Sequence, residues 1–175
     1  PYHIYGKNAL YKAGHHGNAI LSKFPFIRWN NIDVSRYRRT SRSLLHSSIE
    51  VSTLQTKINV ICIHFALFRN ERETQLAKLK SEIGLVADND PLIIAGDFND
   101  WQEEAKLYME NEMNLQEAFM VQFGNHAKTF PSWKPKLPVD RIYFRGLKLL
   151  NCQRLSAKPW QKLSDHLPLY AEFTL

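Results

Sequence analysis

A short polar run after an apolar stretch carries side chains that could activate water or hold a phosphoryl oxygen. The apolar residues 92–95 precede Gly96, and Asp97, Phe98 and Asn99 follow directly. The apolar run is typical of a strand buried on both faces, and ligands of α/β proteins bind beyond the carboxyl ends of such strands. The glycine at position 96 indicates a point where a side chain would obstruct a close approach. Alternation across Phe98 predicts that Asp97 and Asn99 point the same way. A plain turn is the alternative, because Gly, Asp and Asn are common turn residues.

Four further residues of chemical interest lie at strand ends or turns. His64 closes the apolar run KINVICIH, Asp140 stands near the start of VDRIYFR, and Asp165 and His166 precede the last apolar segment. Taken singly, each has an ordinary interpretation: a histidine that closes a buried strand is usually structural, and an acid beside Arg141 usually forms a surface ion pair. Together with Asp97 and Asn99, however, they supply two histidines, three carboxylates and an amide.

Composition narrows the class of protein and the kind of partner. The chain has 175 residues, of which 44% are hydrophobic, enough for a single domain with a sizeable core. The net charge of +6 favours anionic partners such as DNA, RNA, phosphoesters or lipid headgroups. The densest basic cluster comprises Arg28, Arg36, Arg38, Arg39 and Arg42, although such a run is more often a solvated face than a binding surface.

Cysteine usage and hydropathy bear on the compartment. Cys62 and Cys152 form no CxxC motif, and Cys62 lies in an apolar run where a buried reduced thiol is more plausible than a disulfide. We therefore expect a reducing compartment. No apolar stretch approaches the roughly 20 residues of a membrane helix, and no signal peptide is visible, so we expect a soluble, cytoplasmic protein without a transmembrane segment.

The order of apolar periods predicts strands and helices in alternation. Residues 71–87 show helical spacing, with Asn70 and Glu73 spaced as a capping box, and the strand before them and the strand from Pro91 complete a βαβ-like unit. Residues 1–16, with His15 and His16, are interpreted as a loop or ragged edge. The other expected elements are strands over 17–22, 26–34, 42–51, 57–64, 139–145, 147–155 and 169–175, a helix over 103–112, and a long irregular segment over 114–138.

Taken in order, these motifs resemble the endonuclease/exonuclease/phosphatase family of metal-dependent phosphohydrolases. The matching segments are GNAILS at Gly17, the strand ending in His64, ERETQ at Glu71, GDFN at Gly96, DRI at Asp140 and SDHLP at Ser164. Five or six motifs in the right order are far more specific than GDFN alone. The segments SRSLLHSSI, HFALFRNERETQL and GDFNDW further resemble a bacterial branch of the family whose substrate is generally unassigned. The resemblance implies an α/β sandwich of two mixed β-sheets flanked by helices.

The resemblance also implies roles for the residues singled out above. Asp97 would orient or deprotonate the attacking water, Asn99 would hold that water or a phosphoryl oxygen, and His64 would donate to a nonbridging oxygen. His166 would contact the scissile phosphate, with Asp140 fixing its tautomer. Asp165 would be a ligand to Mg²⁺ or Mn²⁺. A phosphodiester transition state concentrates negative charge, so cationic and hydrogen-bonding groups stabilise it while a carboxylate prepares the nucleophile.

One part of the family pattern is not found in this sequence. Family members open with a strand, a helix and a strand that bring an Asn and a Glu to the metal, and too few residues precede Gly17 to supply them. We therefore expect a fold that is incomplete at its N-terminal edge, with the missing segment supplied by the parent polypeptide or by another chain. The expected function is divalent-metal-dependent hydrolysis of a phosphodiester, by a nuclease or by a small-molecule or lipid-headgroup phosphodiesterase. The alternatives are a noncatalytic phosphate- or nucleic-acid-binding module that uses the basic face near Arg36 to Arg42, and an inactive fragment of such an enzyme.

Overall fold

A six-stranded mixed sheet forms the centre of the computed structural model, which describes residues 1–37 and 41–175. Arg38 and Arg39 of the basic cluster lie outside the described residues. The strand order is β3-β4-β5-β6-β8-β7, and all neighbours are antiparallel except β5 and β6, which are parallel. These strands are β3 (Phe26–Asp33), β4 (Ser43–Val51), β5 (Thr56–His64), β6 (Leu92–Asp97), β7 (Gln116–Glu117) and β8 (Asp140–Arg145).

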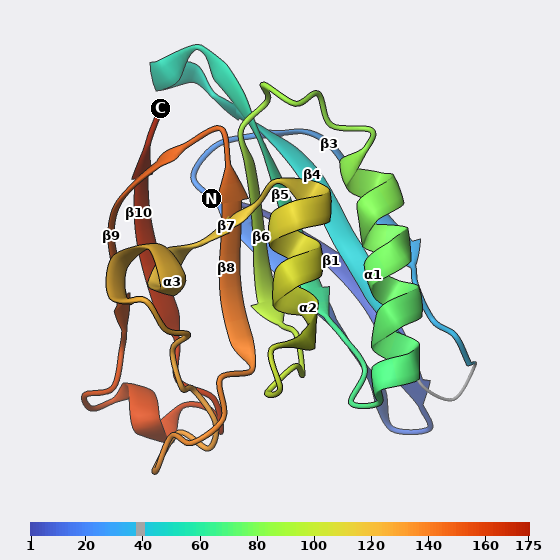
Figure 1. Cartoon of the computed structure of the whole chain (residues 1–175). Coiled ribbons are helices and arrows are strands. Elements are labelled where there is room, and N and C mark those ends of the chain that lie inside the picture. The colour runs from blue at the N-terminus through green and yellow to red at the C-terminus, as the bar shows by residue number, and fades with distance from the viewer. Residues whose placement is uncertain (38–40) are drawn as a thin grey trace.

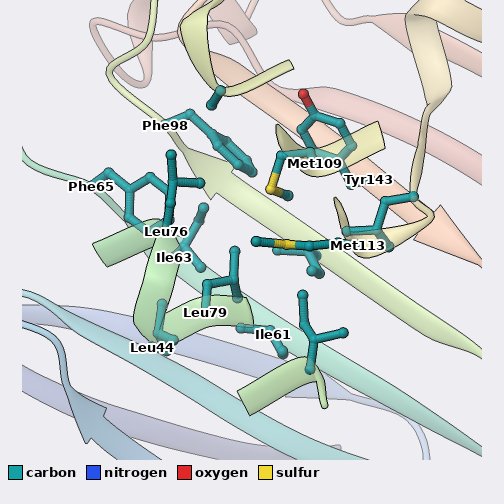
Figure 2. Close-up of a cluster of buried hydrophobic side chains, with 14 of the residues drawn as sticks. Leu44, Ile61, Ile63, Phe65, Leu76, Leu79, Phe98, Met109, Met113 and Tyr143 are labelled. Atoms are coloured by element: carbon teal, nitrogen blue, oxygen red, sulfur yellow. The ribbon is translucent and has the colours of Figure 1, made fainter. Parts of the chain in front are cut away.

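Helices cover one face of this sheet. Helix α1 (Arg69–Ile83) connects β5 to β6, and α2 (Glu104–Leu107) continues into a π-helical turn (Tyr108–Glu112), as Figure 1 shows in front of the sheet. The main hydrophobic cluster lies between these helices and the sheet (Figure 2). Its buried side chains include Leu44, Ile61, Ile63, Leu76, Leu79, Phe98, Met109 and Tyr143.

Two separate antiparallel pairs cover the opposite face. The first pair is β1 (Tyr2–Tyr11) with β2 (Gly14–Ser22), and the second is β9 (Lys148–Arg154) with β10 (Leu169–Thr174). Strand alternation explains this division, because Leu44 faces the helices while its neighbour Leu45 packs with the first pair. The short helix α3 (Ala118–Phe123) packs with the second pair. Two 3₁₀ turns, Ser52–Leu54 and Trp160–Lys162, complete the elements.

The α/β class is confirmed, with helices against a mixed sheet. In the part of the chain that the structure describes, the second β layer consists of two antiparallel pairs rather than one mixed sheet. Both cysteines are free: Cys152 is buried and Cys62 is partly buried. Among the described residues, no helix combines the length and apolar character needed to cross a membrane.

The prediction that residues 1–16 form a loop is wrong. They make β1 and the start of β2, so His15 and His16 lie in a strand. The inward positions of β1 include Gly6, where a Cβ would meet the Asn31 side-chain oxygen at 2.1 Å. A buried glycine gives no hydrophobic signal, which hid the alternation of this strand.

The helix predictions were partly wrong. Helix α1 begins at Arg69 with Phe68 as its N-cap, without a side-chain capping bond, so the capping box is not formed. Glu73 instead pairs with Arg69, and the Arg69 Nε lies 3.1 Å from the Glu73 carboxylate. The helix ends at Ile83, four residues before the expected end. Val86, which continues the apolar period, is buried but lies in the turn that follows the helix. The segment 114–138, expected to be irregular, contains β7 and α3, both too short to show a period.

Candidate active site

Three of the chemically interesting residues meet where β5, β6 and β8 lie side by side. In the strand register, His64 stands opposite Asp97, and Asp97 stands opposite Asp140. Side chains directly opposite each other point to the same face of a sheet. His64 Nε2 lies 3.5 Å from Asp97 Oδ2. The expected convergence of these residues at strand ends is therefore found in the structure.

His166 joins this row through Asp140. The imidazole Nδ1 lies 2.8 Å from Asp140 Oδ2, and the same carboxylate oxygen accepts a hydrogen bond from the Thr129 hydroxyl. Thr129 is fully buried, and the ring of Phe130 packs on that of His166 with centroids 4.9 Å apart. Asp140 and His166 line a cavity of about 330 Å³. The carboxylate is thus held from behind by a buried threonine and can fix the orientation of the imidazole.

The environment separates the pKa values of these groups. Burial, followed by the nearby charge of Asp140, raises the pKa of Asp97 from 3.8 to about 6. Burial, followed by the positive charge of Arg42, lowers the pKa of His64 from 6.5 to about 4. The hydrogen bond to Asp140 raises the pKa of His166. At neutral pH His64 is therefore uncharged, and its contact with Asp97 is not an ion pair.

Two residues near this row were not identified as site residues from the sequence. The positive charge of Arg42 lowers the pKa values of both Asp97 and His64, and its Nε donates to the carbonyl oxygen of Phe65 at 3.4 Å. His16 also lowers the pKa of His64. The sequence pattern groups Arg42 with a solvated basic face and places His16 in a loop. Only the packing of β2 and β4 beside β5 could have placed them here.

The GDFN motif ends β6 in a strained, tightly packed turn. Gly96 has φ +145°, and a Cβ there would meet the Ile63 carbonyl oxygen at 2.0 Å, which confirms the expected close approach. Asn99 has φ 48°, so strand alternation does not extend to it. Its Nδ2 donates to the Phe65 carbonyl oxygen at 2.9 Å, and its backbone N–H donates to Asp97 Oδ1 at 2.8 Å. The amide nitrogen of Asn99 is therefore committed to the loop after β5, and its catalytic role stays a prediction.

The ERETQ motif holds the same loop from the helix side. The Gln75 side-chain oxygen accepts a hydrogen bond from the Ala66 backbone N–H at 2.9 Å. Arg72, which is 5% exposed, donates to the Leu67 carbonyl oxygen at 2.6 Å. Because this loop follows His64 directly, helix α1 positions the end of β5. Gln75 and Arg72 thus help to position the loop beside the site.

Asp165 occupies an exposed position beside His166. Its backbone oxygen accepts from the Ser132 N–H at 2.7 Å, and its carboxylate contributes to the raised pKa of His166. Among residues 1–37 and 41–175, no group of three or more His, Cys, Asp or Glu side chains is arranged to hold a metal ion. A single exposed carboxylate competes weakly with the hydration shell of Mg²⁺. These residues therefore do not by themselves fit the Mg²⁺ or Mn²⁺ ion that the resemblance implies.

Comparisons with known proteins bear on the family and the fold of this chain. The model of the endonuclease/exonuclease/phosphatase family matches residues 1–166. The protein YbhP of Escherichia coli (strain K12) is 39% identical over 171 residues, which are 98% of this chain and 68% of YbhP. The human Nocturnin catalytic domain with bound sulfate superposes with a TM-score of 0.80 at 17% identity, over 99% of this chain and 72% of that one. The mannosyl-6-phosphatase Bt3783 of Bacteroides thetaiotaomicron gives a TM-score of 0.79 at 14% identity, over 100% of this chain and 78% of that one. Because the family model spans nearly all of its residues, the chain belongs to the endonuclease/exonuclease/phosphatase family.

Proposed function

We propose that this chain carries the catalytic residues of a phosphoesterase that hydrolyses a phosphodiester by in-line attack of water. The observation that carries the proposal is the row from His64 through Asp97 and Asp140 to His166. It combines a carboxyl group of pKa about 6 with an imidazole that is oriented by a second carboxylate. Such a pair of differently tuned groups is what general acid–base catalysis near neutral pH requires.

Asp97 acts as the base that receives the proton of the attacking water. Its pKa of about 6 leaves it mostly ionised at pH 7, yet makes it a stronger base than an exposed carboxylate. One oxygen, Oδ1, accepts the backbone N–H of Asn99, which fixes the carboxylate plane. Asn99 holds the water or a phosphoryl oxygen with its side-chain oxygen, since its nitrogen is engaged with Phe65.

His166 faces the phosphoryl group and supplies a proton or a hydrogen bond to it. Asp140 engages Nδ1, so Nε2 is the nitrogen left for the substrate. Thr129 keeps Asp140 in place from the buried side. His64, neutral at pH 7, donates to a nonbridging oxygen, and Arg42 adds a positive charge close to the site. Positive and hydrogen-bonding groups around developing phosphoryl charge stabilise the transition state.

Dependence on a divalent metal is part of the proposal because family members generally use one. Asp165 is the residue we assign to Mg²⁺ or Mn²⁺, which would neutralise phosphoryl charge when bound. The described residues offer this ion too few ligands, so the steps above are assigned only to side chains of the chain itself.

Hydrolysis of a generic phosphodiester tests the proposal. We expect the full-length polypeptide to cleave bis-p-nitrophenyl phosphate with Mg²⁺ or Mn²⁺. His166→Ala should lower kcat by roughly 10²- to 10⁴-fold, the usual contribution of a general acid or base, and Asp140→Asn by somewhat less. His3→Ala, which changes an exposed histidine on β1, is the matched control. Near wild-type turnover in His166→Ala would remove the assignment. Phosphate binding without any turnover would favour the noncatalytic binding module.

A further inference from the structure

Two loops beside His166 are bonded into one surface. The first covers residues 126–139 and the second residues 153–164, and Figure 1 shows both at the lower left, below β8, β9 and β10. The Ser132 hydroxyl donates to the Gln161 carbonyl oxygen at 3.2 Å, and Arg154 Nη1 donates to the Lys128 carbonyl oxygen at 2.8 Å. The two loops therefore present their outer side chains together.

Large apolar side chains stand exposed on this surface. The exposed fractions are 75% for Trp133, 67% for Leu163, 38% for Trp160 and 36% for Leu137. Backbone hydrogen bonds fix the turns that carry them, from Lys134 to Pro131, from Leu137 to Phe130 and from Leu163 to Trp160. Apolar groups gathered on a firmly built surface indicate a partner that covers them.

The same loops are strictly basic. Each contains three Lys or Arg residues and neither contains an Asp or Glu, so together they hold charges equal to the +6 of the whole chain. The basic residues are Lys128, Lys134, Lys136, Arg154, Lys158 and Lys162, all of them exposed. We call the exposed Trp, Leu and Lys side chains of these two loops the Trp–Lys surface; it comprises Trp133, Leu137, Trp160, Leu163, Lys134, Lys136, Lys158 and Lys162.

We propose that the Trp–Lys surface docks on an anionic phospholipid membrane. Tryptophan is the side chain that best occupies the headgroup region, leucine partitions into the acyl boundary, and lysine is attracted to anionic headgroups. The lysines of this surface are positively charged and the phospholipid headgroups are negatively charged, so the two surfaces are complementary in charge.

A single-stranded nucleic acid is the competing partner, and the composition of the surface disfavours it. Bases stack on aromatic rings, whereas Leu137 and Leu163 offer no ring. Nucleic-acid surfaces also favour the planar guanidinium of arginine, yet the one arginine of these loops, Arg154, is engaged with the Lys128 carbonyl oxygen.

Docking would place the candidate active site next to the bilayer. The Ser132 N–H donates to the Asp165 carbonyl oxygen, and Phe130 packs on His166, so the first loop is continuous with the site. Membrane docking does not depend on the proposed hydrolysis, because it is tested by measuring binding to vesicles and needs no enzymatic activity.

Vesicle co-sedimentation tests the docking. The chain should bind vesicles of phosphatidylglycerol mixed with phosphatidylcholine, and bind phosphatidylcholine vesicles far more weakly. Trp133→Ala with Leu163→Ala should weaken binding roughly 100-fold, about tenfold for each side chain withdrawn from apolar surroundings. Leu21→Ala with Leu85→Ala is the matched control, since these leucines are 76% and 73% exposed elsewhere on the molecule. Equal losses in the two pairs would overturn the proposal.

Charge is tested in the same way. Lys134→Gln with Lys162→Gln should weaken binding to the anionic vesicles roughly 25-fold, about fivefold for each lysine near the surface. Lys23→Gln with Lys148→Gln, also exposed, should lose much less. Unchanged binding in the first pair would contradict the charge argument. Tighter binding to an oligo(dT) strand, weakened by the same variants, would assign the surface to nucleic acid and refute membrane docking.

Discussion

Replacing Asp97 by Asn should stabilise the folded protein at neutral pH, although it removes the proposed base. The pKa of this carboxyl is 3.8 ordinarily and about 6 in the folded protein. Between these values the unfolded chain has released the proton while the folded protein still holds it. The free energy of unfolding therefore falls as pH rises through this range, and the full penalty is present above about pH 6.

The size of the effect follows from the two pKa values. At about 1.4 kcal/mol for each pKa unit, the penalty for ionised Asp97 is about 3 kcal/mol at pH 7. The amide that replaces the carboxyl keeps an oxygen for the Asn99 N–H and is the same size, so little else should change. For a domain of this length we expect a rise in Tm of roughly 6 to 12 °C as an upper limit.

Urea unfolding across about pH 4 to pH 7 measures this directly. The difference between Asp97→Asn and the wild type should be small at the acid end and grow with pH, because the acid end protonates the wild-type carboxyl. Asp88→Asn, with a fully exposed side chain, is the control and should show no such trend. A variant that is less stable at pH 7, or a difference independent of pH, would refute the assigned environment of Asp97.

Three further predictions concern the surroundings of the site. Gly96→Ala should destabilise the fold by at least about 2 kcal/mol, because the new Cβ meets a backbone oxygen at 2.0 Å and the positive φ adds strain. Urea unfolding measures this, and Gly84→Ala, at a helical φ of -61° where the new Cβ meets nothing nearer than 3.4 Å, should stay within error of the wild type. Thr129→Val should lower kcat roughly tenfold with little change in KM, because the carboxylate of Asp140, which orients His166, loses the hydrogen bond from Thr129. A wild-type kcat would show that this bond is dispensable. Calorimetry of residues 1–175 should find Mg²⁺ binding no tighter than roughly millimolar, since Asp165 is a single exposed ligand; micromolar binding would show that other residues complete a site.

The sequence predicted those elements whose side chains carry a clear period. The strand expected at 57–64 is β5 (Thr56–His64), and the helix expected at 71–87 is α1, because Leu76, Leu79 and Ile83 mark one buried face. Boundaries were less certain where a buried residue lies outside the element, as Val86 does. Strand β1 was missed because Gly6 holds an inward position without a side chain.

The candidate site was predictable as a set of residues but not as a network. Residues at strand ends were identified from their types, and parallel pairing of β5 with β6 brings His64 to Asp97. The support from Thr129 could not be found, because a loop residue shows its partner only after the loop is folded. Arg42 was assigned to a different surface for the same reason.

A comparison of two aspartates supports the proposed functional interpretation of GDFN over that of a plain turn. Asp33 and Asp97 make the same local bond, each accepting at 2.8 Å from the backbone N–H two residues later, Ser35 and Asn99. In Asp33 hydrogen bonds from Ser35 are the largest influence and lower its pKa, as expected of an aspartate that only stabilises a turn. In Asp97 the same bond is outweighed by burial and by Asp140, and the pKa rises to about 6. The turn bond is therefore present in both, but only Asp97 is held in a position that disfavours its own charge. Ionisable groups with pKa values shifted in this way cluster at functional sites, which supports the role proposed for Asp97 as the base.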